Sequence, residues 1–258
     1  MIQLNKLSVG YPDVDDAVLK HLDMAVKPGN FVCLLGRNGA GKSTLLRTLA
    51  GLQNTKAGQV LIHDQNVHSL NPVERARHIA VVLTDRQFGL GLTVDDAVAM
   101  GRQPHTGWRG KLSHHDWDLV AKALKLADAS NLAGRYLDDL SDGEKQRVMI
   151  ARAVAQAPRV MLLDEITAFL DLPGRVASMM MLKQYAVANS ATVVLSSHDL
   201  ELSLQLADTI WLLDGKGNCL TGTPSSLQET GAIAAVFDTR DVKFSAITKQ
   251  FELQKNLN

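Results

Sequence analysis

A glycine-rich segment beginning at Gly36 has the clearest chemical pattern in the chain. It follows the apolar run 31–35 and reads Gly36-Arg37-Asn38-Gly39-Ala40-Gly41-Lys42-Ser43-Thr44. The segment up to Ser43 fits the spacing G-x-x-x-x-G-K-[ST], in which backbone N–H groups cradle phosphates at the start of a helix. Lys42 would add a positive charge toward the β- and γ-phosphates, and the Ser43 hydroxyl would hold Mg²⁺. The segment therefore predicts a phosphate loop that binds a nucleotide.

Two adjacent carboxylates follow another apolar run. Asp164 and Glu165 come directly after residues 160–163. In α/β proteins, ligands bind at the carboxyl ends of the parallel strands. Asp164 is suited to hold Mg²⁺ through water, and Glu165 is suited to polarise an attacking water for phosphoryl transfer. A purely structural role, in which both acids cap the next helix, is the weaker interpretation beside a phosphate loop.

A histidine and a serine-led turn complete the set of candidate residues. His198 follows the apolar run 192–195 and could donate a hydrogen bond to a γ-phosphate. Alternatively, this stretch serves only to cap the next helix, through Ser197 or Asp199. The segment Ser141-Asp142-Gly143-Glu144 is a capping box that opens a helix, and a helix start of this kind is also an anion site.

Apolar patterns predict the elements that hold these residues. The runs 31–35, 160–163 and 192–195 are typical of parallel strands buried on both faces. Period-two alternation over residues 1–30 predicts half-exposed antiparallel strands. Tyr11 lies in a turn between these strands, where it either covers the sheet edge or stacks on a nucleobase.

Residues 85–157 have a different pattern. Capping boxes at 93–96 and 113–116 open helices, and the Gly and Pro content of 101–108 predicts a loop. We therefore expect an α/β fold with a mainly parallel core. The predicted division is a nucleotide-binding core with an antiparallel β subdomain in residues 1–84 and 158–222, an inserted helical subdomain in 85–157, and a C-terminal extension in 223–258.

Composition narrows the class of protein. The 258 residues include 27 Lys+Arg and 27 Asp+Glu, so the chain lacks the basic excess of nucleic-acid binders. Two cysteines do not suggest a disulfide framework. We read no signal peptide at the N-terminus, and the apolar runs are far shorter than a membrane span. Any membrane role must then come through a partner.

Taken together, the motifs resemble those of the ATP-binding cassette (ABC) ATPases, in the same order and over nearly the whole chain. The resemblance implies a P-loop NTPase core and hydrolysis of ATP with Mg²⁺. It also implies that the signature, Ser141 to Glu144, contacts ATP held by the other subunit of a head-to-tail homodimer. By motif position it assigns phosphate binding to Gly36–Thr44, adenine stacking to Tyr11, Mg²⁺ to Ser43 and Asp164, the general base to Glu165, the switch role to His198, and the dimer-crossing loop to Asp171.

The chain departs from the family pattern at three places. The signature reads Ser-Asp-Gly-Glu where the family usually has Ser-Gly-Gly-Gln, which places extra negative charge near a phosphate. Ile166 stands where a proline usually follows the glutamate. The glutamine that usually leaves the sheet toward the helical insertion, a further Mg²⁺ ligand, corresponds either to Asp85 or to Gln87. For the signature we expect Ser141 to cap its own helix in the open state and to turn to phosphate on closure.

The segment Gly101-Arg102-Gln103-Pro104-His105 and the stretch 200–213 resemble importers of iron–siderophore complexes, haem and cobalamin. We therefore expect a separate ATPase subunit at the cytoplasmic face of the inner membrane. Its partners would be a second copy, integral membrane permease subunits docked on the helical subdomain and, indirectly, a substrate-binding protein, without nucleic acid. Two alternatives stay open: an ABC ATPase of an assembly machine, such as iron–sulfur cluster biogenesis, and a nucleotide-gated module that barely hydrolyses ATP.

Overall fold

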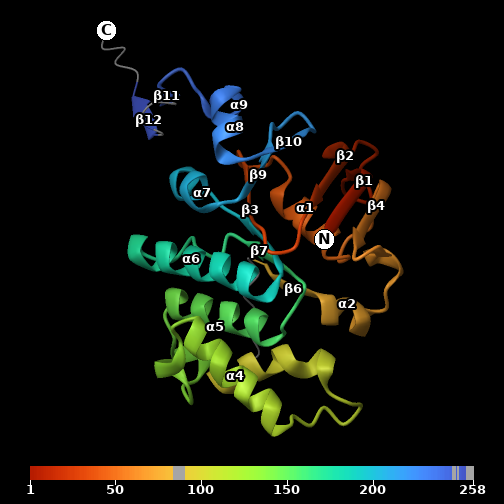
Figure 1. Cartoon of the computed structure of the whole chain (residues 1–258), viewed down its shortest axis with the longest axis vertical. Helices are drawn as coiled ribbons and strands as arrows, with labels where there is room; N and C mark the ends of the chain where they lie inside the picture. Colours follow the sequence, from red (N-terminus) through yellow and green to blue (C-terminus); the bar gives the residue numbers. More distant parts are fainter. Residues whose placement is uncertain (84–90, 246–247, 249, 254–258) are drawn as a thin grey trace.

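The computed structural model describes residues 1–83, 91–245, 248 and 250–253. Its centre is a six-stranded sheet in the order β10-β9-β3-β8-β7-β6, parallel throughout except where β10 pairs with β9 (Figure 1). The predicted mainly parallel sheet is confirmed. Its strands are β3 (Phe31–Gly36), β6 (Ile79–Val82), β7 (Val160–Asp164), β8 (Thr192–Ser196), β9 (Thr209–Leu213) and β10 (Cys219–Gly222).

The register of this sheet brings the chemical segments to one edge. Asp164 at the end of β7 pairs with Ser196 at the end of β8, and Leu34 in β3 pairs with the same serine. Parallel strands finish at the same edge of their sheet. The phosphate loop after β3, Glu165 after β7 and His198 after β8 therefore begin side by side.

A four-stranded antiparallel sheet, in the order β2-β1-β4-β5, forms the N-terminal part, as predicted. Side chains alternate across β3 and divide the core: Phe31, Cys33 and Leu35 belong to one cluster, whereas Val32 and Leu34 pack with this second sheet and helix α1 (Lys42–Leu49). The central sheet is thus covered on both faces, which explains its continuous apolar runs. The strands are β1 (Ile2–Val9), β2 (Leu19–Val26), β4 (Ala57–Ile62) and β5 (Gln65–Asn66).

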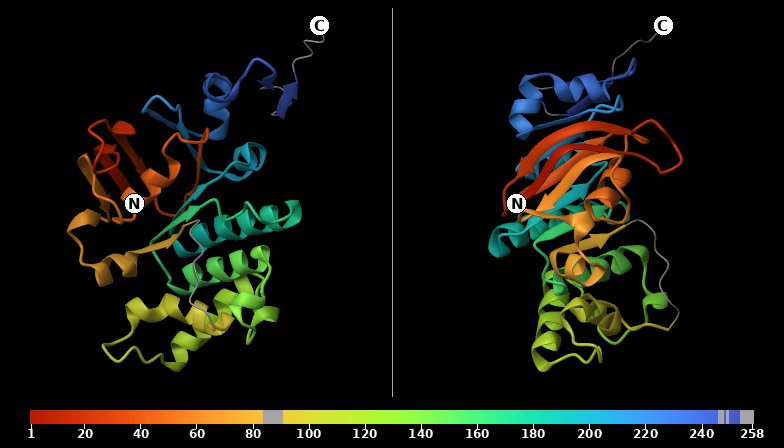
Figure 2. Two further views of the ribbon diagram at one scale, coloured as in Figure 1. Left: turned by 180° about the vertical axis from the view of Figure 1, so that it is seen from behind. Right: turned by 90° about the vertical axis from the view of Figure 1, so that its right-hand side faces the viewer.

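Helices cover the central sheet and extend the molecule at one end. Figure 2 shows the green and yellow helices between β6 and β7 gathered opposite the C-terminal hairpin. The α-helices are α1 (Lys42–Leu49), α2 (Pro72–His78), α3 (Val94–Ala99), α4 (His114–Leu126), α5 (Asp142–Ala155), α6 (Leu172–Asn189), α7 (Leu200–Leu206), α8 (Pro224–Glu229) and α9 (Ala232–Phe237). Short 3-10 helices are η1 (Val67–Ser69), η2 (Met100–His105), η3 (Ser130–Leu132) and η4 (Leu137–Asp139), and the hairpin strands are β11 (Val242–Ser245) and β12 (Gln250–Leu253).

The prediction of a loop over 101–108 is wrong for most of that stretch, because residues up to His105 belong to η2. Arg102 is buried in this segment, pairs with Asp116 at 3.0 Å and donates to the carbonyl oxygen of Ala155 at 2.8 Å. These contacts fix the backbone, and a short 3-10 helix tolerates Pro104 because it needs few internal N–H donors. Within the part of the chain that the structure describes, no helix has the length and apolarity to cross a bilayer.

Candidate functional site

The phosphate loop joins β3 to α1. Gly41 precedes the helix with φ +100°, and a Cβ there would lie 2.7 Å from Cγ1 of Val18, so only glycine fits without strain. No side chain caps the first turn of α1. Its N–H groups therefore stay available to an anion, which also gains from the positive end of the helix dipole.

Lys42 is buried at the start of α1. Its ammonium donates a hydrogen bond to the carbonyl oxygen of Gly36 at 3.0 Å, across the mouth of the loop. Burial lowers the pKa of Lys42, while the negative charges of Glu165 and Asp164 act in the opposite direction. A bound phosphate would compensate the same desolvated charge, so the loop is built for an anion.

A cavity of about 410 Å³ opens over the loop and collects residues from four separate segments. The ring of Tyr11 stands at its side, 53% exposed, and its hydroxyl accepts a hydrogen bond from Oγ1 of Thr44 at 3.3 Å. An exposed ring beside the loop can take a stacking partner. The lining residues are Tyr11, Val18, Asn38, Gly39, Gly41, Lys42, Ser43, Thr44, Glu165 and His198.

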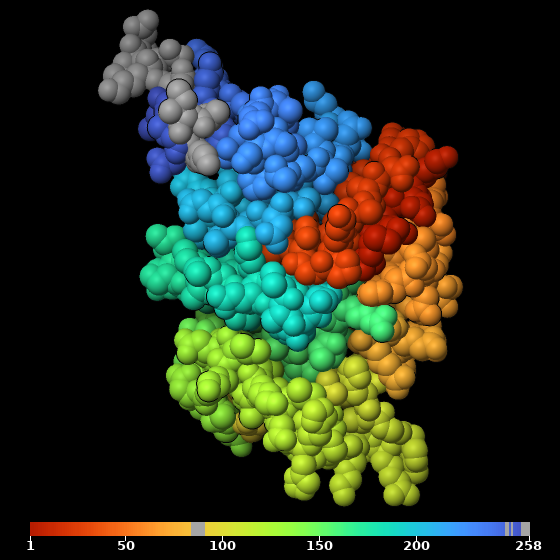
Figure 3. All heavy atoms as spheres, in the orientation of Figure 1, coloured from red at the N-terminus to blue at the C-terminus, as the bar shows by residue number. Residues whose placement is uncertain are grey.

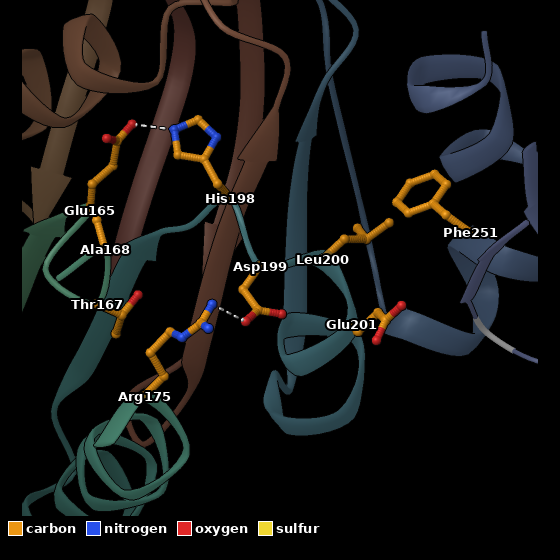
Figure 4. A pocket seen from close by; sticks show the side chains of 9 residues that line it. All are labelled: Glu165, Thr167, Ala168, Arg175, His198, Asp199, Leu200, Glu201 and Phe251. Carbon is orange, nitrogen blue, oxygen red and sulfur yellow. Dashed lines mark hydrogen bonds and ion pairs between the residues drawn. The ribbon is translucent and has the colours of Figure 1, made fainter. Parts of the chain in front are cut away.

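Glu165 and His198 meet across the ends of β7 and β8. Oε1 of Glu165 lies 2.6 Å from Nε2 of His198, and both side chains are partly exposed (Figure 4). Glu165 has a left-handed backbone, φ +51°, held by hydrogen bonds from its N–H to the carbonyl oxygen and hydroxyl of Ser196 at 3.3 and 3.1 Å. Strained backbone of this kind persists where the surroundings fix it, and it is frequent at functional sites.

The same pair also borders a second cavity of about 440 Å³, which lies between α6, α7 and the C-terminal hairpin (Figure 4). Arg175 of α6 and Asp199 form an ion pair there at 3.0 Å. Asp199 also caps α7 by accepting from the N–H of Leu202. Sequence reasoning missed Arg175, because nothing in its local pattern marks a partner so far along the chain.

The residues present fit a magnesium ion bound with a nucleotide. Asp164 is buried, and its Oδ1 accepts from Oγ of Ser196 at 2.5 Å, which orients the carboxylate at the carboxyl edge of the sheet. Ser43 offers a hydroxyl from the cavity wall. Mg²⁺ prefers such oxygen ligands and keeps several waters, so one or two protein ligands suffice. Accordingly, no cluster of three or more His, Cys, Asp or Glu residues suited to a metal occurs among the described residues.

Asp85 and Gln87, the two candidates for a further Mg²⁺ ligand, lie outside the described residues. Asp171 does not line either cavity described above; its Oδ1 accepts from the N–H of Gly174 at 3.0 Å and so caps α6. Gly36, Arg37 and Ala40 form the loop without lining the cavity over it.

The signature turn is a complete capping box at the start of α5. Oγ of Ser141 accepts from the N–H of Glu144 at 3.3 Å and donates to its Oε2 at 2.8 Å. Arg135 pairs with the other oxygen of Glu144 at 3.1 Å. Hydrogen bonds from Ser141, helped by Arg135, lower the pKa of Glu144. No residue from 141 to 144 lines the cavity over the phosphate loop.

Comparisons with known proteins agree with this geometry. Residues 19–168 match the family described as ABC transporter. An uncharacterized ABC transporter ATP-binding protein of Methanocaldococcus jannaschii is 34% identical over 99% of this chain and 88% of its own length. The Hemin import ATP-binding protein of Nocardia farcinica is 39% identical over 85% of this chain and 75% of its own length.

One solved structure is a dimeric ATP-binding cassette in a post-hydrolysis state, bound to ADP and phosphate. It superposes with a TM-score of 0.75 at 27% identity and covers 87% of this chain and 99% of its own. Further relatives, at 31–37% identity, are named for import of cobalamin, import of petrobactin and transport of achromobactin.

Proposed function

This chain belongs to the ABC transporter family, whose ATP-binding cassettes hydrolyse ATP, and from that premise we propose that it is the ATPase subunit of an importer for metal chelates. The observation that carries the proposal is the shared cavity. Lys42 and Ser43 of the phosphate loop line it together with Glu165 and His198, which follow two other strands. This arrangement supports phosphate-binding and water-activating roles for these groups toward one ligand.

We assign the chemistry to residues at the ends of β3, β7 and β8. The N–H groups of the loop and Lys42 bind the phosphates. Glu165 accepts the proton of the attacking water, and His198, already 2.6 Å from Glu165, orients that water and the γ-phosphate. Magnesium held by Ser43 and Asp164 would neutralise charge that develops on the phosphates.

In this proposal, a second copy of the chain contributes its helix start at Ser141 to the nucleotide site of the first copy. Ser141 to Glu144 form an anion-competent helix start that is absent from the wall of their own nucleotide cavity. A head-to-tail homodimer brings this turn onto the partner's nucleotide, and the dimeric cassette that superposes on this chain supports such an assembly. We assign contact with membrane permease subunits to the helical subdomain, residues 85–157.

Metal chelates are the proposed cargo because relatives are named for import of cobalamin, petrobactin or hemin and for transport of achromobactin. We assign the binding of the cargo to other subunits and the cavity over the phosphate loop to the nucleotide. As part of the same proposal, the chain acts at the cytoplasmic face of the inner membrane, and a substrate-binding protein is its indirect partner.

The test of turnover is Glu165→Gln. We expect phosphate release to fall at least about 100-fold, as for loss of a general base, and ATP to trap a dimer on size exclusion. Glu201→Gln is the matched control, because Glu201 lines only the second of the two cavities and should leave turnover unchanged. Turnover of Glu165→Gln at the parent rate would overturn the assignment.

The test of cargo is reconstitution. The chain should co-purify with a multi-span permease, and proteoliposomes of that complex should take up one of ferric siderophore, haem or cobalamin when ATP is present. ATPase activity stimulated by the permease without uptake of any of the three would reject the cargo. Stimulation only by a cluster-assembly partner would favour the assembly machine.

A further inference from the structure

Trp108 is the most exposed large apolar side chain among the described residues. It is 91% exposed, compared with 44% for Trp117 and 0% for Trp211. Trp108 lies in a turn between η2 and α4, which is closed by a hydrogen bond from the N–H of Gly110 to the carbonyl oxygen of Gly107 at 2.9 Å. The yellow-green segment around it projects from the end of the molecule opposite the C-terminus (Figures 1 and 3).

Positive charge surrounds this ring. The guanidinium of Arg109 lies 4.9 Å from the centroid of Trp108, and Lys111 is exposed two residues further on. No Asp or Glu occurs from residue 106 to residue 115. The first acid after the loop, Asp116, is engaged by Arg102 and Ser113. The tip of the loop is therefore cationic as well as aromatic.

This chemistry favours a lipid surface over a protein groove. Protein hot spots are also enriched in Trp and Arg, but they lie in well-packed, desolvated pockets near the centre of an interface. Here the exposed neighbours of Trp108 are glycine and cations. Tryptophan side chains settle at the headgroup level of bilayers, and each Lys or Arg near an anionic leaflet adds further attraction. We propose that the loop Gly107–Lys111 inserts Trp108 among the headgroups of a membrane that contains anionic phospholipids.

Lipid contact at this loop is independent of the catalytic assignment, and it would orient the helical subdomain against the bilayer. It differs from the expectation from the sequence that any membrane role comes through a partner, because a loop can bind headgroups without a membrane span. A single ring with two cations gives weak, reversible binding. We expect removal of either cation to lower vesicle partitioning about fivefold, and removal of the ring to lower it about tenfold. Added salt should weaken binding, because exposed charges are screened.

Vesicles of phosphatidylcholine and phosphatidylglycerol in equal parts provide the test, with pure phosphatidylcholine as the reference. The full chain carrying Trp117→Phe leaves Trp108 as its exposed fluorophore. We expect a blue shift of emission and quenching by brominated lipid with anionic vesicles, reduced in Arg109→Ala and Lys111→Ala. Trp108→Ala lacks this fluorophore, so its partitioning is measured by co-sedimentation with the vesicles beside the parent, and we expect it to be about tenfold weaker. Lys56→Ala, which removes an exposed charge from the antiparallel-sheet part, should bind like the parent.

The variants must retain ATPase activity and thermal stability, which separates loss of lipid binding from misfolding and from any failure of the proposed function. Equal partitioning of Trp108→Ala and the parent would overturn the proposal. So would protection of Trp108 by a detergent-solubilised permease in the absence of anionic lipid, because the ring would then belong to a protein interface.

Discussion

Replacing Ser141 with alanine separates the two roles of its hydroxyl. In this structure the hydroxyl closes the capping box with Glu144. Loss of an N-cap serine costs about 1 kcal/mol of stability. A hydrogen bond to a charged phosphate contributes about 1.5–3 kcal/mol. Since the cap must be released before the phosphate bond forms, the hydroxyl favours closure by the difference, about 0.5–2 kcal/mol, or roughly 2- to 30-fold for each site.

We therefore expect Ser141→Ala to lower ATP turnover of the assembled complex by several-fold per site, measured as phosphate release at saturating ATP. Ser113→Ala is the matched control: Ser113 caps α4 through the same pair of hydrogen bonds, to Asp116, and has no place at the nucleotide. Both variants should lose about 1 kcal/mol in denaturant unfolding, whereas only Ser141→Ala should lose turnover. Parent-like turnover of Ser141→Ala in the assembled complex would refute the exchange of partners.

Three further perturbations follow from the contacts. Arg102→Ala leaves a mostly buried Asp116 without its cation and should lower the unfolding free energy by about 3 kcal/mol in urea titrations; a loss below about 1 kcal/mol would contradict the pairing. Hydrogen bonds from Ser113, with Arg102 adding to them, hold the pKa of folded Asp116 at about 2, compared with its ordinary 3.8, so its stabilisation is present above pH 3.8 and lost as pH falls toward 2; Asp116→Asn should remove this part of the acid dependence. Tyr11→Ala should raise the KM for ATP about tenfold and Tyr11→Phe should not, if the ring stacks on the base.

Residues whose signals are local could be assigned from the sequence. The capping boxes at Ser113 and Ser141 form as predicted, because the partner of each serine is only three residues away. The loop before Lys42 can likewise be predicted from the sequence, because its glycine spacing determines the backbone conformation independently of distant residues. For the stretch after β8, the capping interpretation is confirmed, because Asp199 caps α7. His198 faces Glu165, and its contact with a γ-phosphate stays a prediction.

Contacts between distant segments cannot be predicted from local sequence patterns. Glu165 and His198 meet at 2.6 Å although 33 positions separate them, and the left-handed backbone of Glu165 depends on Ser196 of another strand. The 3-10 helix η2 was mistaken for a loop because the burial of Arg102 depends on α4 and α5. The C-terminal hairpin likewise depends on tertiary contacts, among them Phe251 packed edge-on against Phe244, with ring centroids 5.6 Å apart.

The turn at Ser141–Glu144 is connected to His198 within one chain through the start of α6. A Cβ on Gly143 would lie 3.4 Å from the carbonyl oxygen of Phe169, so the turn packs on the segment that leads into α6. One turn into α6, Arg175 pairs with Asp199, the residue after His198. In the proposed dimer the turn faces the partner's nucleotide and His198 faces its own. Coupling free energies between two binding sites are reciprocal. If the partner's nucleotide, bound at the turn, changes the affinity for the nucleotide at His198, then the nucleotide at His198 changes the affinity for the partner's nucleotide at the turn by the same factor.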